Sequence, residues 1–454
     1  MIKDNDNKPD KNNKNLRRRK NGGTPAPPKS KNDGYTDSYI NVTERNNPDP
    51  IYLPENKYYT NIADKIKLIK WIITVLLLAF VAASVMFNSR ELNAGSLGYF
   101  LRYINIQGAN WSGRTEFNIE LDEASAICYY RNNIVSLRRN RLDIYDMSGR
   151  RNFTHRLVYS NPVIKTSERY IIAYDLGMNK MEIFNSFSRV YEHKGGGPIY
   201  GAQVTDRGNV VYITSEGRHK FTVCVMDSSF TEIFRRQISD DYIVGADIDD
   251  RADRLVTAGF SARGGDYLSR IILQDTHIEE PVKIIEVTGE QPYGVKLNQD
   301  GIFAVFENSV RFYDNNGDFI SSYNFSGRTI RSMSLTEKLA AVVLTERTLG
   351  ADNRILIFDG AGNILYDAVA DSEIKDLKFS KDYRELYFLT RAGLYRINII
   401  NNINIGQEKS SEIKSEFEFI TDEYDETTDN IIYANDRNIF LSGLTKVNII
   451  NARG

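Results

Sequence analysis

Cysteine is scarce in this sequence: Cys128 and Cys224 are the only two cysteines among 454 residues, and no CxxC pair occurs. A chain of this length does not need the disulfide framework that stabilises small secreted domains. Each cysteine lies in an apolar run that is typical of a strand, AICYY and FTVCVM, where a lone cysteine behaves as a small hydrophobic residue. We therefore expect two separate thiols in the core, while an even number of cysteines in an exported domain also permits one disulfide.

Long uncharged apolar runs are lacking too, with the single exception of Trp71–Phe87, WIITVLLLAFVAASVMF. As a helix this run spans roughly 26 Å at about 1.5 Å per residue, slightly less than a hydrocarbon core of about 30 Å. Leu68 and Ile69 extend it, because the Lys70 side chain can reach toward the lipid headgroups. The sequence thus predicts one transmembrane helix over residues 66–89.

Charge is distributed unequally on the two sides of this run, although the net charge is only −2. Residues 1–70 contain 15 Lys+Arg and 9 Asp+Glu, whereas residues 71–454 contain 43 and 51. Because cytoplasmic flanks carry the excess of basic residues, we predict a single-pass protein of the cell membrane with its N-terminus inside and its C-terminal domain extracytoplasmic. A cleaved signal peptide ending near Val81–Ala83 is the alternative, but a leader of about seventy residues is far too long for it.

Residues 1–60 are rich in Lys, Asn, Asp and Pro and have almost no apolar clusters. Such a segment buries too little surface to offset its chain entropy, so we predict a disordered cytoplasmic tail. Its LRRRK cluster, Leu16–Lys20, either binds anionic lipid or a cytosolic partner, or serves only to set the topology. Residues 90–114 are expected to connect the anchor to a C-terminal domain over residues 115–454.

From residue 115 onward the chain consists of short β-branched and aromatic runs separated by Gly, Asn and Asp, a strand-and-turn pattern. One motif recurs as two or three apolar residues, an Asp or Asn, and a turn, as in LDIYDMSG, VRFYDNNG and ILIFDGAG. A period near 40–45 residues with four short strands per unit is typical of β-propeller blades. The polar positions of the motif recur at intervals of 39 to 48 residues: Asp146, Asn185, Asp227, Asp275, Asp314, Asp359, Asn398 and Ser442.

A second element precedes the motif at the place of the innermost strand of a blade, as in PIYGAQVTDRG, QPYGVKLNQDG and EIKDLKFSKDY. We expect Gly201, Gly245 and Gly294 in these strands to permit close backbone approach around a central channel. Eight polar positions predict an all-β, eight-bladed propeller, with seven blades as the alternative if the degenerate last copy is a flap. Residues 115–121, TEFNIEL, are expected to supply the outer strand that the last copy lacks and so to close the ring without exposed edges.

No catalytic or metal-binding set accompanies the repeats. GxSxG and P-loop motifs are absent, which leaves no signature of a serine nucleophile or of nucleotide binding. Asp and Gly in the motif turns fit hairpin geometry better than calcium, and Asp247–Asp253 fits a solvated loop, because Arg251 stands where an EF-hand needs an oxygen. A metal in the channel would need inward imidazoles on several blades, but the histidines fall on outer strands or loops in this register: His155, His193, His219 and His277. We therefore predict no catalytic residues, no metal and no cofactor.

Tryptophan is nearly absent as well, since Trp71 and Trp111 both precede the repeats. The chain thus departs from WD40 repeats, from the tryptophan-docked blades of quinoprotein dehydrogenases and from sialidase-type Asp boxes. Nucleic-acid binding is disfavoured, because residues 71–454 are net acidic and have no basic stripe to release counterions.

The mouth of the channel is where we expect a ligand, because the repeats place six polar or aromatic side chains on or beside inner strands. The alternative is that these side chains line the channel and bond only one another and water, since buried polar groups need partners. The six candidates for ligand binding are Tyr200, Tyr293, Arg331, Lys375, Asp376 and Lys378.

The Asn/Lys-rich tail, the single anchor and the Trp-free blades resemble a family of Gram-positive envelope proteins of unknown function, over about residues 71–454. LNQDGIFAVF and FSKDYRELYFLT also look like the general YVTN/WD40-like bacterial propeller repeats. The resemblance implies a propeller and carries over no catalytic residue. The favoured hypothesis is a membrane-tethered scaffold that binds a protein or cell-envelope partner. The alternatives are a propeller hydrolase or lyase acting on an envelope glycan, and a transmembrane sensor that signals through the basic tail.

Overall fold

The computed structural model describes residues 38–42, 51–55, 57–87, 116–118, 126–346, 353–399, 417–424, 426–444 and 446–453. The chain divides into two units, Met1–Phe87 and Asn88–Gly454. In the first unit, β1 (Ser38–Val42) pairs antiparallel with β2 (Ile51–Glu55), and α1 (Lys57–Phe87) follows. Most of the tail predicted over residues 1–60 and the connector predicted over residues 90–114 lie outside the described residues.

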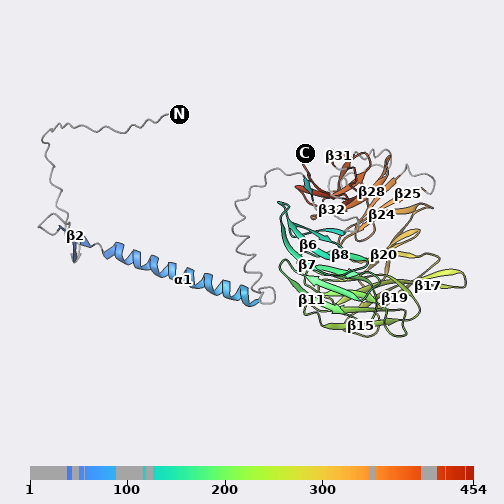
Figure 1. The fold of residues 1–454 in the computed structure, drawn as a ribbon, viewed down its shortest axis with the longest axis horizontal. Helices are drawn as coiled ribbons and strands as arrows, with labels where there is room; N and C mark the ends of the chain where they lie inside the picture. Colours follow the sequence, from blue (N-terminus) through green and yellow to red (C-terminus); the bar gives the residue numbers. More distant parts are fainter. Residues whose placement is uncertain are drawn as a thin grey trace, which may run out of the picture. The chain divides into compact units, whose positions relative to one another are not determined.

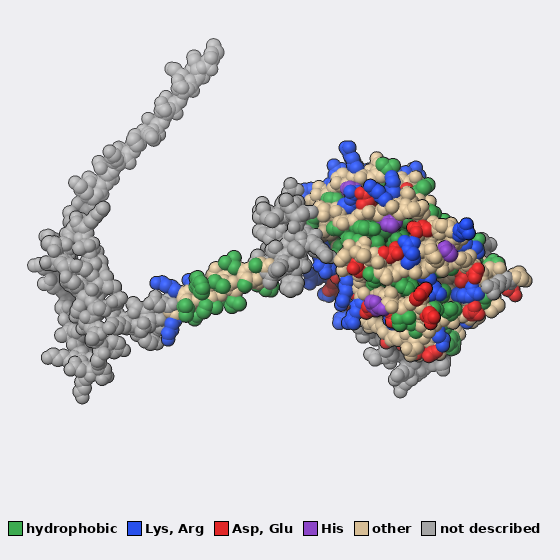
Figure 2. Space-filling view, turned by 90° about the horizontal axis from the view of Figure 1, so that it is seen from below, with side chains coloured by type: hydrophobic (Ala, Val, Ile, Leu, Met, Phe, Trp, Pro, Cys, Tyr) green, Lys and Arg blue, Asp and Glu red, His purple; other side chains and the backbone are tan. Residues whose placement is uncertain are grey.

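Helix α1 contains the apolar run of the sequence, and no Pro or Gly interrupts it. Its side chains from Lys65 to Phe80 are exposed, and Figure 2 shows hydrophobic side chains along the helix with basic ones at one end. Among the residues that the structure describes, no helix combines the length and the apolar character that a membrane span requires. The span expected over residues 66–89 stays a prediction from the sequence.

The described part of the second unit is a β-propeller of eight four-stranded antiparallel sheets, as predicted. The chain passes once around the ring, from blade 1 in teal to blade 8 in red (Figure 1). The first strand of each blade is the innermost, because first strands of neighbouring blades contact one another around the axis in seven of the eight pairs.

Blades 1 to 4 follow one another without a crossover. Blade 1 contains β4 (Ala126–Tyr130), β5 (Asn133–Leu137), β6 (Arg141–Asp146) and β7 (Arg151–Arg156). Blade 2 contains β8 (Pro162–Thr166), β9 (Ile171–Asp175), β10 (Lys180–Phe184) and β11 (Arg189–Lys194). Blade 3 contains β12 (Ile199–Val204), β13 (Val210–Thr214), β14 (Phe221–Met226) and β15 (Glu232–Ile238). Blade 4 contains β16 (Tyr242–Ile248), β17 (Arg254–Arg263), β18 (Asp266–Asp275) and β19 (Lys283–Thr288).

Blades 5 to 7 repeat this order, and blade 8 takes its last strand from elsewhere in the chain. Blade 5 contains β20 (Pro292–Leu297), β21 (Gly301–Phe306), β22 (Ser309–Asp314) and β23 (Phe319–Asn324). Blade 6 contains β24 (Thr329–Leu335), β25 (Ala340–Thr345), β26 (Asn353–Phe358) and β27 (Ile364–Ala370). Blade 7 contains β28 (Ile374–Phe379), β29 (Glu385–Thr390), β30 (Leu394–Asn398) and β31 (Glu418–Thr421). Blade 8 contains β32 (Asn430–Ala434), β33 (Asn438–Ser442), β34 (Lys446–Asn451) and β3 (Glu116–Asn118).

Blade 8 closes the ring by joining strands from opposite ends of the propeller sequence. Strand β3 pairs antiparallel with β34, with Phe117 opposite Val447. Strand β32 also contacts β4 of blade 1. The prediction that TEFNIEL supplies the missing outer strand is confirmed, and the seven-bladed alternative is wrong.

The register predicted for the last blade is wrong. Ser442 ends β33, the second strand of blade 8, whereas the other seven polar positions end or follow third strands. The equivalent residue is Asn451 at the end of β34, whose Oδ1 accepts a hydrogen bond from the Arg453 N–H at 3.0 Å. The error has a simple cause: blade 7 contains an insertion between β30 and β31, so the interval from Asn398 to Asn451 is longer than the repeat period.

The turn interpretation of the motif is confirmed. Asp314 Oδ1 accepts hydrogen bonds from the N–H groups of Asn316 and Asp318, each at 2.8 Å. Gly317 has a positive φ of 79°, which a residue with a side chain rarely adopts. The same two bonds recur at Asp146, Asp227 and Asp359.

The core lies between blades, because each sheet buries both faces against its neighbours. Second strands such as β21 are buried along their whole length, whereas outer strands such as β23 alternate between exposed and half-buried residues. Phe303 and Phe312 of blade 5 pack with Phe358 of blade 6, with ring centroids of Phe312 and Phe358 5.3 Å apart. Burial of each of these Phe side chains contributes about 1.5–3 kcal/mol to the free energy of unfolding. Phe side chains thus fill the space between blades 5 and 6.

Both cysteines are free thiols, as expected. Burial raises the pKa of Cys128 and of Cys224 to about 11.

We expect neither thiol to react with a thiolate-specific reagent such as dithiobis(nitrobenzoate) in the folded protein, because only about one in a thousand is ionised at pH 8. Counting reactive thiols at pH 8 checks this, with both thiols titrating after unfolding in guanidinium as the control. Rapid release of one equivalent of thionitrobenzoate by the folded protein would contradict this expectation.

We expect deletion of residues 116–118 to lower the melting temperature by about 5 °C or more, because it removes the closing strand and exposes the edge of β34. Thermal unfolding of the full chain checks this. The matched control is a deletion of residues 1–37, which removes no described strand and is expected to leave the melting temperature unchanged. An equal melting temperature for the two deletions would show that closure does not depend on β3.

Candidate functional site

The five inner strands predicted from the second repeat element all form, as β12, β16, β20, β24 and β28. Each contains a β-bulge near its beginning, where one residue has no partner on the second strand, and a bulge changes the direction of its side chain. We call the end of the ring at which the inner strands begin the start face. The bulged residues are Tyr200, Val244, Tyr293, Arg331 and Lys375.

Four of the six predicted site residues therefore occupy one equivalent position on the start face. The side chains of Tyr200 and Tyr293 are both 44% exposed. The glycine that follows the bulge does not relieve backbone crowding: a Cβ at Gly201 would lie 3.5 Å from the Ile213 Cδ1, and one at Gly245 would lie 4.0 Å from the Val295 Cγ1. A Cβ at Gly294 would also meet only side-chain atoms, the nearest being the Met333 Cε at 3.0 Å. The expectation of close backbone approach is therefore wrong at all three positions.

The two charged bulge residues form ion pairs between neighbouring blades. Arg331 of blade 6 binds Glu373, which precedes β28 of blade 7, at 2.5 Å. Lys375 of blade 7 binds the Asp429 carboxylate at 2.8 Å and the Thr428 carbonyl at 2.9 Å, both beside blade 8. These charges thus form a paired polar rim.

Five aromatic side chains, three of them exposed and two half-buried, form a continuous stripe on the start face across blades 3 and 4. Tyr200 contacts Phe221 at 5.1 Å between ring centroids, and Phe221 contacts Tyr242 at 6.1 Å. Tyr242 contacts Phe260 at 5.9 Å, and Phe260 contacts Tyr267 at 5.8 Å. Tyr242 is 52% exposed, and the ten-residue strands β17 and β18 extend the stripe along a hairpin that projects from the ring (Figure 1). We call these five residues the aromatic stripe.

A second set of equivalent positions lines the channel nearer the other end of the inner strands, which we call the end face. In each blade the penultimate residue of the inner strand occupies this position. We call the eight residues the channel ring: Tyr129, Lys165, Gln203, Asp247, Lys296, Ser334, Lys378 and Tyr433.

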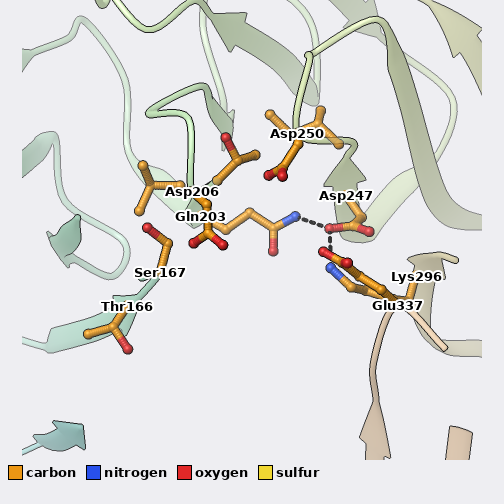
Figure 3. Close-up of a pocket in the computed structure, with 11 residues that line it drawn as sticks. Thr166, Ser167, Gln203, Asp206, Asp247, Asp250, Lys296 and Glu337 are labelled. Carbon is orange, nitrogen blue, oxygen red and sulfur yellow. Dashed lines mark hydrogen bonds and ion pairs between the residues drawn. The ribbon is translucent and has the colours of Figure 1, made fainter. Parts of the chain in front are cut away.

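Hydrogen bonds and electrostatic interactions within the channel ring place these side chains in the channel. Gln203 Nε2 donates to Asp247 Oδ1 at 2.5 Å, and Lys296 Nζ donates to the same oxygen at 2.9 Å (Figure 3). Lys165 of blade 2 interacts electrostatically with Asp247 of blade 4 and Lys296 of blade 5. Because these blades are not neighbours of blade 2, the interaction crosses the channel.

The prediction that Asp247 belongs to a solvated loop is wrong. Its side chain is not part of a solvated loop: the residue is 3% exposed and also accepts a hydrogen bond from the Leu297 N–H at 2.8 Å. Sequence reasoning placed it in the acidic run that follows β16, whereas the structure places it on β16 itself.

Three cavities open around the channel ring. The largest, about 720 Å³, lies on the end face and is lined by Tyr129, Tyr433, Lys378 and the turns that follow inner strands. A cavity of about 180 Å³ beside it contains Asp206, Asp250 and Glu337 (Figure 3). A third, about 450 Å³, lies between blades 7, 8 and 1, and its lining includes Asp376, Asp429 and Lys378.

Of the six predicted residues, Asp376 and Lys378 line these three cavities, whereas the bulges direct the other four onto the start face. Burial raises the pKa of the Asp376 carboxyl, while hydrogen bonds from the backbone N–H groups of Ile431 and Leu377 oppose that shift. Asp376 Oδ2 accepts the Ile431 bond at 2.8 Å, which joins blade 7 to blade 8.

The sequence analysis did not single out the charged turns of the end face, because its candidates were residues on or beside the inner strands. A signal was present: the second residue after the inner strand is charged in six of the eight blades. Lys381 of blade 7 forms an ion pair with Glu168 of blade 2, although blades 8 and 1 lie between them. The six charged residues are Glu168, Asp206, Asp250, Glu337, Lys381 and Asp436.

Among the described residues, no group of three or more His, Cys, Asp or Glu is placed to hold a metal ion. The four histidines lie on outer strands or in loops, as expected: His155 on β7, His193 on β11, His219 before β14 and His277 after β18.

Comparison with known proteins gives a family and a fold. The model of a family described as "Family of unknown function (DUF5711)" matches residues 109–417. No curated protein matches the sequence. Among solved structures, the C-terminal WD40 domain of Sif2 is similar with a TM-score of 0.52 and 11% identity, over 75% of this chain and 100% of that one. This likeness shows the propeller fold alone.

Two further solved structures are less similar. BamB from Moraxella catarrhalis has a TM-score of 0.44 and 11% identity, over 74% of this chain and 99% of that one. Sqt1 from Chaetomium thermophilum, bound to the N-terminus of ribosomal protein L10, has a TM-score of 0.49 and 10% identity, over 74% and 98%.

We expect Asp376→Asn to leave the protein equally stable or to raise its melting temperature by about 1–2 °C at pH 7.5. Folding raises the pKa of this carboxyl. Its stabilising contribution is therefore present below the ordinary carboxyl pKa of about 3.9 and is lost as pH rises through the folded pKa. The amide removes this loss and keeps an acceptor for Ile431.

Melting temperatures at pH 7.5 and pH 4 check the sign, and any advantage of the variant should vanish at pH 4. The matched control is Asp371→Asn, an exposed carboxyl beside the same strand. A marked loss of stability for Asp376→Asn at pH 7.5 would show that the ionised carboxylate stabilises the blade.

Proposed function

This chain belongs to the family of unknown function DUF5711, and from that premise we propose that it is a binding module of a Gram-positive cell envelope. A propeller, tethered to the outer side of the membrane by Trp71–Phe87, binds a protein partner through its start face. The observation that carries this proposal is the aromatic stripe.

The five rings contact one another in sequence, and three of them, those of Tyr200, Tyr242 and Tyr267, are exposed to solvent. Tyr is enriched among the residues that dominate protein–protein binding, because it buries a large apolar area while its hydroxyl stays bonded. Lys220 lies over the Tyr242 ring, with its Nζ 4.6 Å from the centroid, and adds a cation beside the stripe.

The surroundings of the stripe also fit a protein partner. Protein interfaces combine an aromatic centre with a polar rim, and the paired charges Arg331–Glu373 and Lys375–Asp429 follow the stripe along the same face. A cell-envelope polymer is the other class of partner expected from the sequence. We favour a protein because three of the four ring contacts are steep, at 66°, 68° and 82°, and so offer no continuous flat platform for successive sugars.

The proposed membrane tether lies in the first unit of the chain. Helix α1 is continuous over Trp71–Phe87, and Lys65, Lys67 and Lys70 precede that run, which favours an N-terminus inside the cell. The propeller would then lie outside, where its free cysteines and its acidic balance carry no penalty.

A second candidate function is a hydrolase or lyase acting on an envelope glycan. One observation favours it: Asp376, a carboxyl whose pKa is raised by burial, lines a cavity of about 450 Å³ together with Asp429. A carboxyl with a raised pKa is suited to act as a general acid.

We expect Tyr200→Ala and Tyr242→Ala to reduce recovery of a protein partner by about tenfold each, the effect of losing one aromatic hot spot. The measurement is quantitative cross-linking and co-purification of the full chain from its own membranes. The matched control is Phe319→Ala, which removes an exposed aromatic on the outer strand of blade 5 and should leave recovery unchanged.

Three outcomes would overturn the proposal in different ways. Equal recovery by all variants would exclude the start face as the binding surface. Recovery of a polysaccharide in place of a protein would change the class of partner. Turnover of a glycan by the wild type, lost in Asp376→Asn, would favour the enzyme.

A further inference from the structure

Blades 1 and 2 carry a strong excess of basic residues. Residues 126–194, which span these two blades, contain 12 Lys+Arg and 6 Asp+Glu, whereas residues 71–454 as a whole are acidic. The six carboxylates all form an ion pair or accept a hydrogen bond within the protein: Asp143, Asp146, Glu168, Asp175, Glu182 and Glu192. The remaining cations of these blades therefore have no carboxylate left to pair with in their own blades.

On the start face, each of the two blades places two cations directly opposite each other. Third strands begin at this face and outer strands end there, because neighbouring strands are antiparallel. In blade 1, Arg141 at the beginning of β6 lies opposite Arg156 at the end of β7. In blade 2, Lys180 of β10 lies opposite Lys194 of β11 at the equivalent position.

These like-charged pairs distinguish blades 1 and 2 from the rest of the ring. In the other six blades, the equivalent pair contains at most one charged residue. Like charges directly opposite each other destabilise a sheet. The stability of the blades therefore does not account for the two pairs.

One member of each pair is compensated and the other is not. Arg141 and Lys194 form ion pairs with carboxylates of their own blades, at 2.6 and 3.0 Å. Arg156 and Lys180 are exposed, and neither forms an ion pair with any residue that the structure describes. These two side chains thus present uncompensated charge to solvent.

Exposed apolar side chains join these cations to the aromatic stripe. Val158 is 74% exposed, and its carbonyl accepts a hydrogen bond from Lys180 Nζ at 3.5 Å. Met178 is 49% exposed, and its carbonyl accepts a hydrogen bond from the Ile199 N–H at 2.7 Å. Ile199 directly precedes Tyr200, the first ring of the stripe. The apolar surface therefore continues from the end of blade 1 across blade 2 to the stripe.

Five exposed cations accompany this apolar surface along the start face of blades 1 to 3. Two of them lie just before third strands, and the others belong to the opposed pairs. We call these residues the basic row: Arg139, Arg156, Lys180, Lys194 and Lys220.

We infer that the start face binds an acidic segment of its protein partner, with carboxylates over the basic row and apolar side chains over Val158, Met178 and the aromatic stripe. The inference rests on the proposed function, because it takes the stripe as the centre of the interface. An acidic protein segment supplies both kinds of group that this surface complements. An anionic envelope polymer supplies charge but leaves the exposed apolar side chains without a partner.

The first test is zero-length coupling by a carbodiimide, which joins a lysine amine to a carboxylate in direct contact with it. The reagent is applied to the full chain in its own membranes, and coupled peptides are identified by mass spectrometry. We expect Lys180 to be joined to an Asp or Glu of another protein. Coupling of Lys194 to Glu192, whose charged atoms lie 3.0 Å apart, is the control for the reagent. Lys180→Arg should keep partner recovery but lose this cross-link, because a guanidinium does not couple.

The second test reverses the uncompensated charge of each pair. Arg156→Glu and Lys180→Glu place a carboxylate opposite a cation, so we expect the melting temperature to stay equal or to rise by about 1 °C. Recovery of the partner should nevertheless fall by about tenfold for each variant. The matched control is Arg207→Glu, which reverses an exposed cation of the end face and should keep recovery.

The outcomes separate this inference from the proposed function. Full recovery by both reversal variants, with loss of the partner in Tyr200→Ala and Tyr242→Ala, would overturn the acidic segment and leave the proposed function standing. Full recovery by the tyrosine variants, with loss in the reversal variants, would refute the role of the stripe but support an acidic partner. Coupling of Lys180 only to its own chain, or recovery of an anionic polymer or lipid without a coupled protein, would overturn the inference.

Discussion

Face-to-face burial of neighbouring sheets is the constraint on which this structure depends. No blade can cover its own apolar second strand: β21 is buried only because blades 4 and 6 lie against its two faces. Every blade therefore needs two neighbours, and the first and last blades need each other. The pairing of β3 with β34 meets this requirement.

The blade architecture was readable in the sequence because turn chemistry and strand pattern repeat in phase. Asp314 and Gly317 each have a local physical reason to occur where they do, so the motif identifies the end of a third strand from a few residues. Blade 8 shows the limit of such reasoning. Once an insertion changes the period, local pattern alone cannot tell a second strand from a third, and Ser442 was placed one strand too early.

The candidate site was less readable, because its geometry is set by register between blades. The sequence suggested that Tyr200 and Lys378 share a channel mouth, but a bulge directs the first onto the start face and the second stays in the channel. Lys165 could not be singled out at all. Its electrostatic partners, Asp247 and Lys296, lie on blades 4 and 5, far from it in the sequence.

Ring closure also has a consequence for biosynthesis. Strand β3 is made early, yet its partner β34 is more than three hundred residues further along the chain. At about 5–20 residues per second, β3 waits on the order of tens of seconds as an unpaired strand. Blades 1 to 7 can assemble in order during that time, but β3 can pair with β34 only after β34 has been synthesised. A chain that stalls before this point exposes an unpaired β3 and an uncovered last blade. Proteases and chaperones can recognise these exposed surfaces as features of an incompletely folded protein.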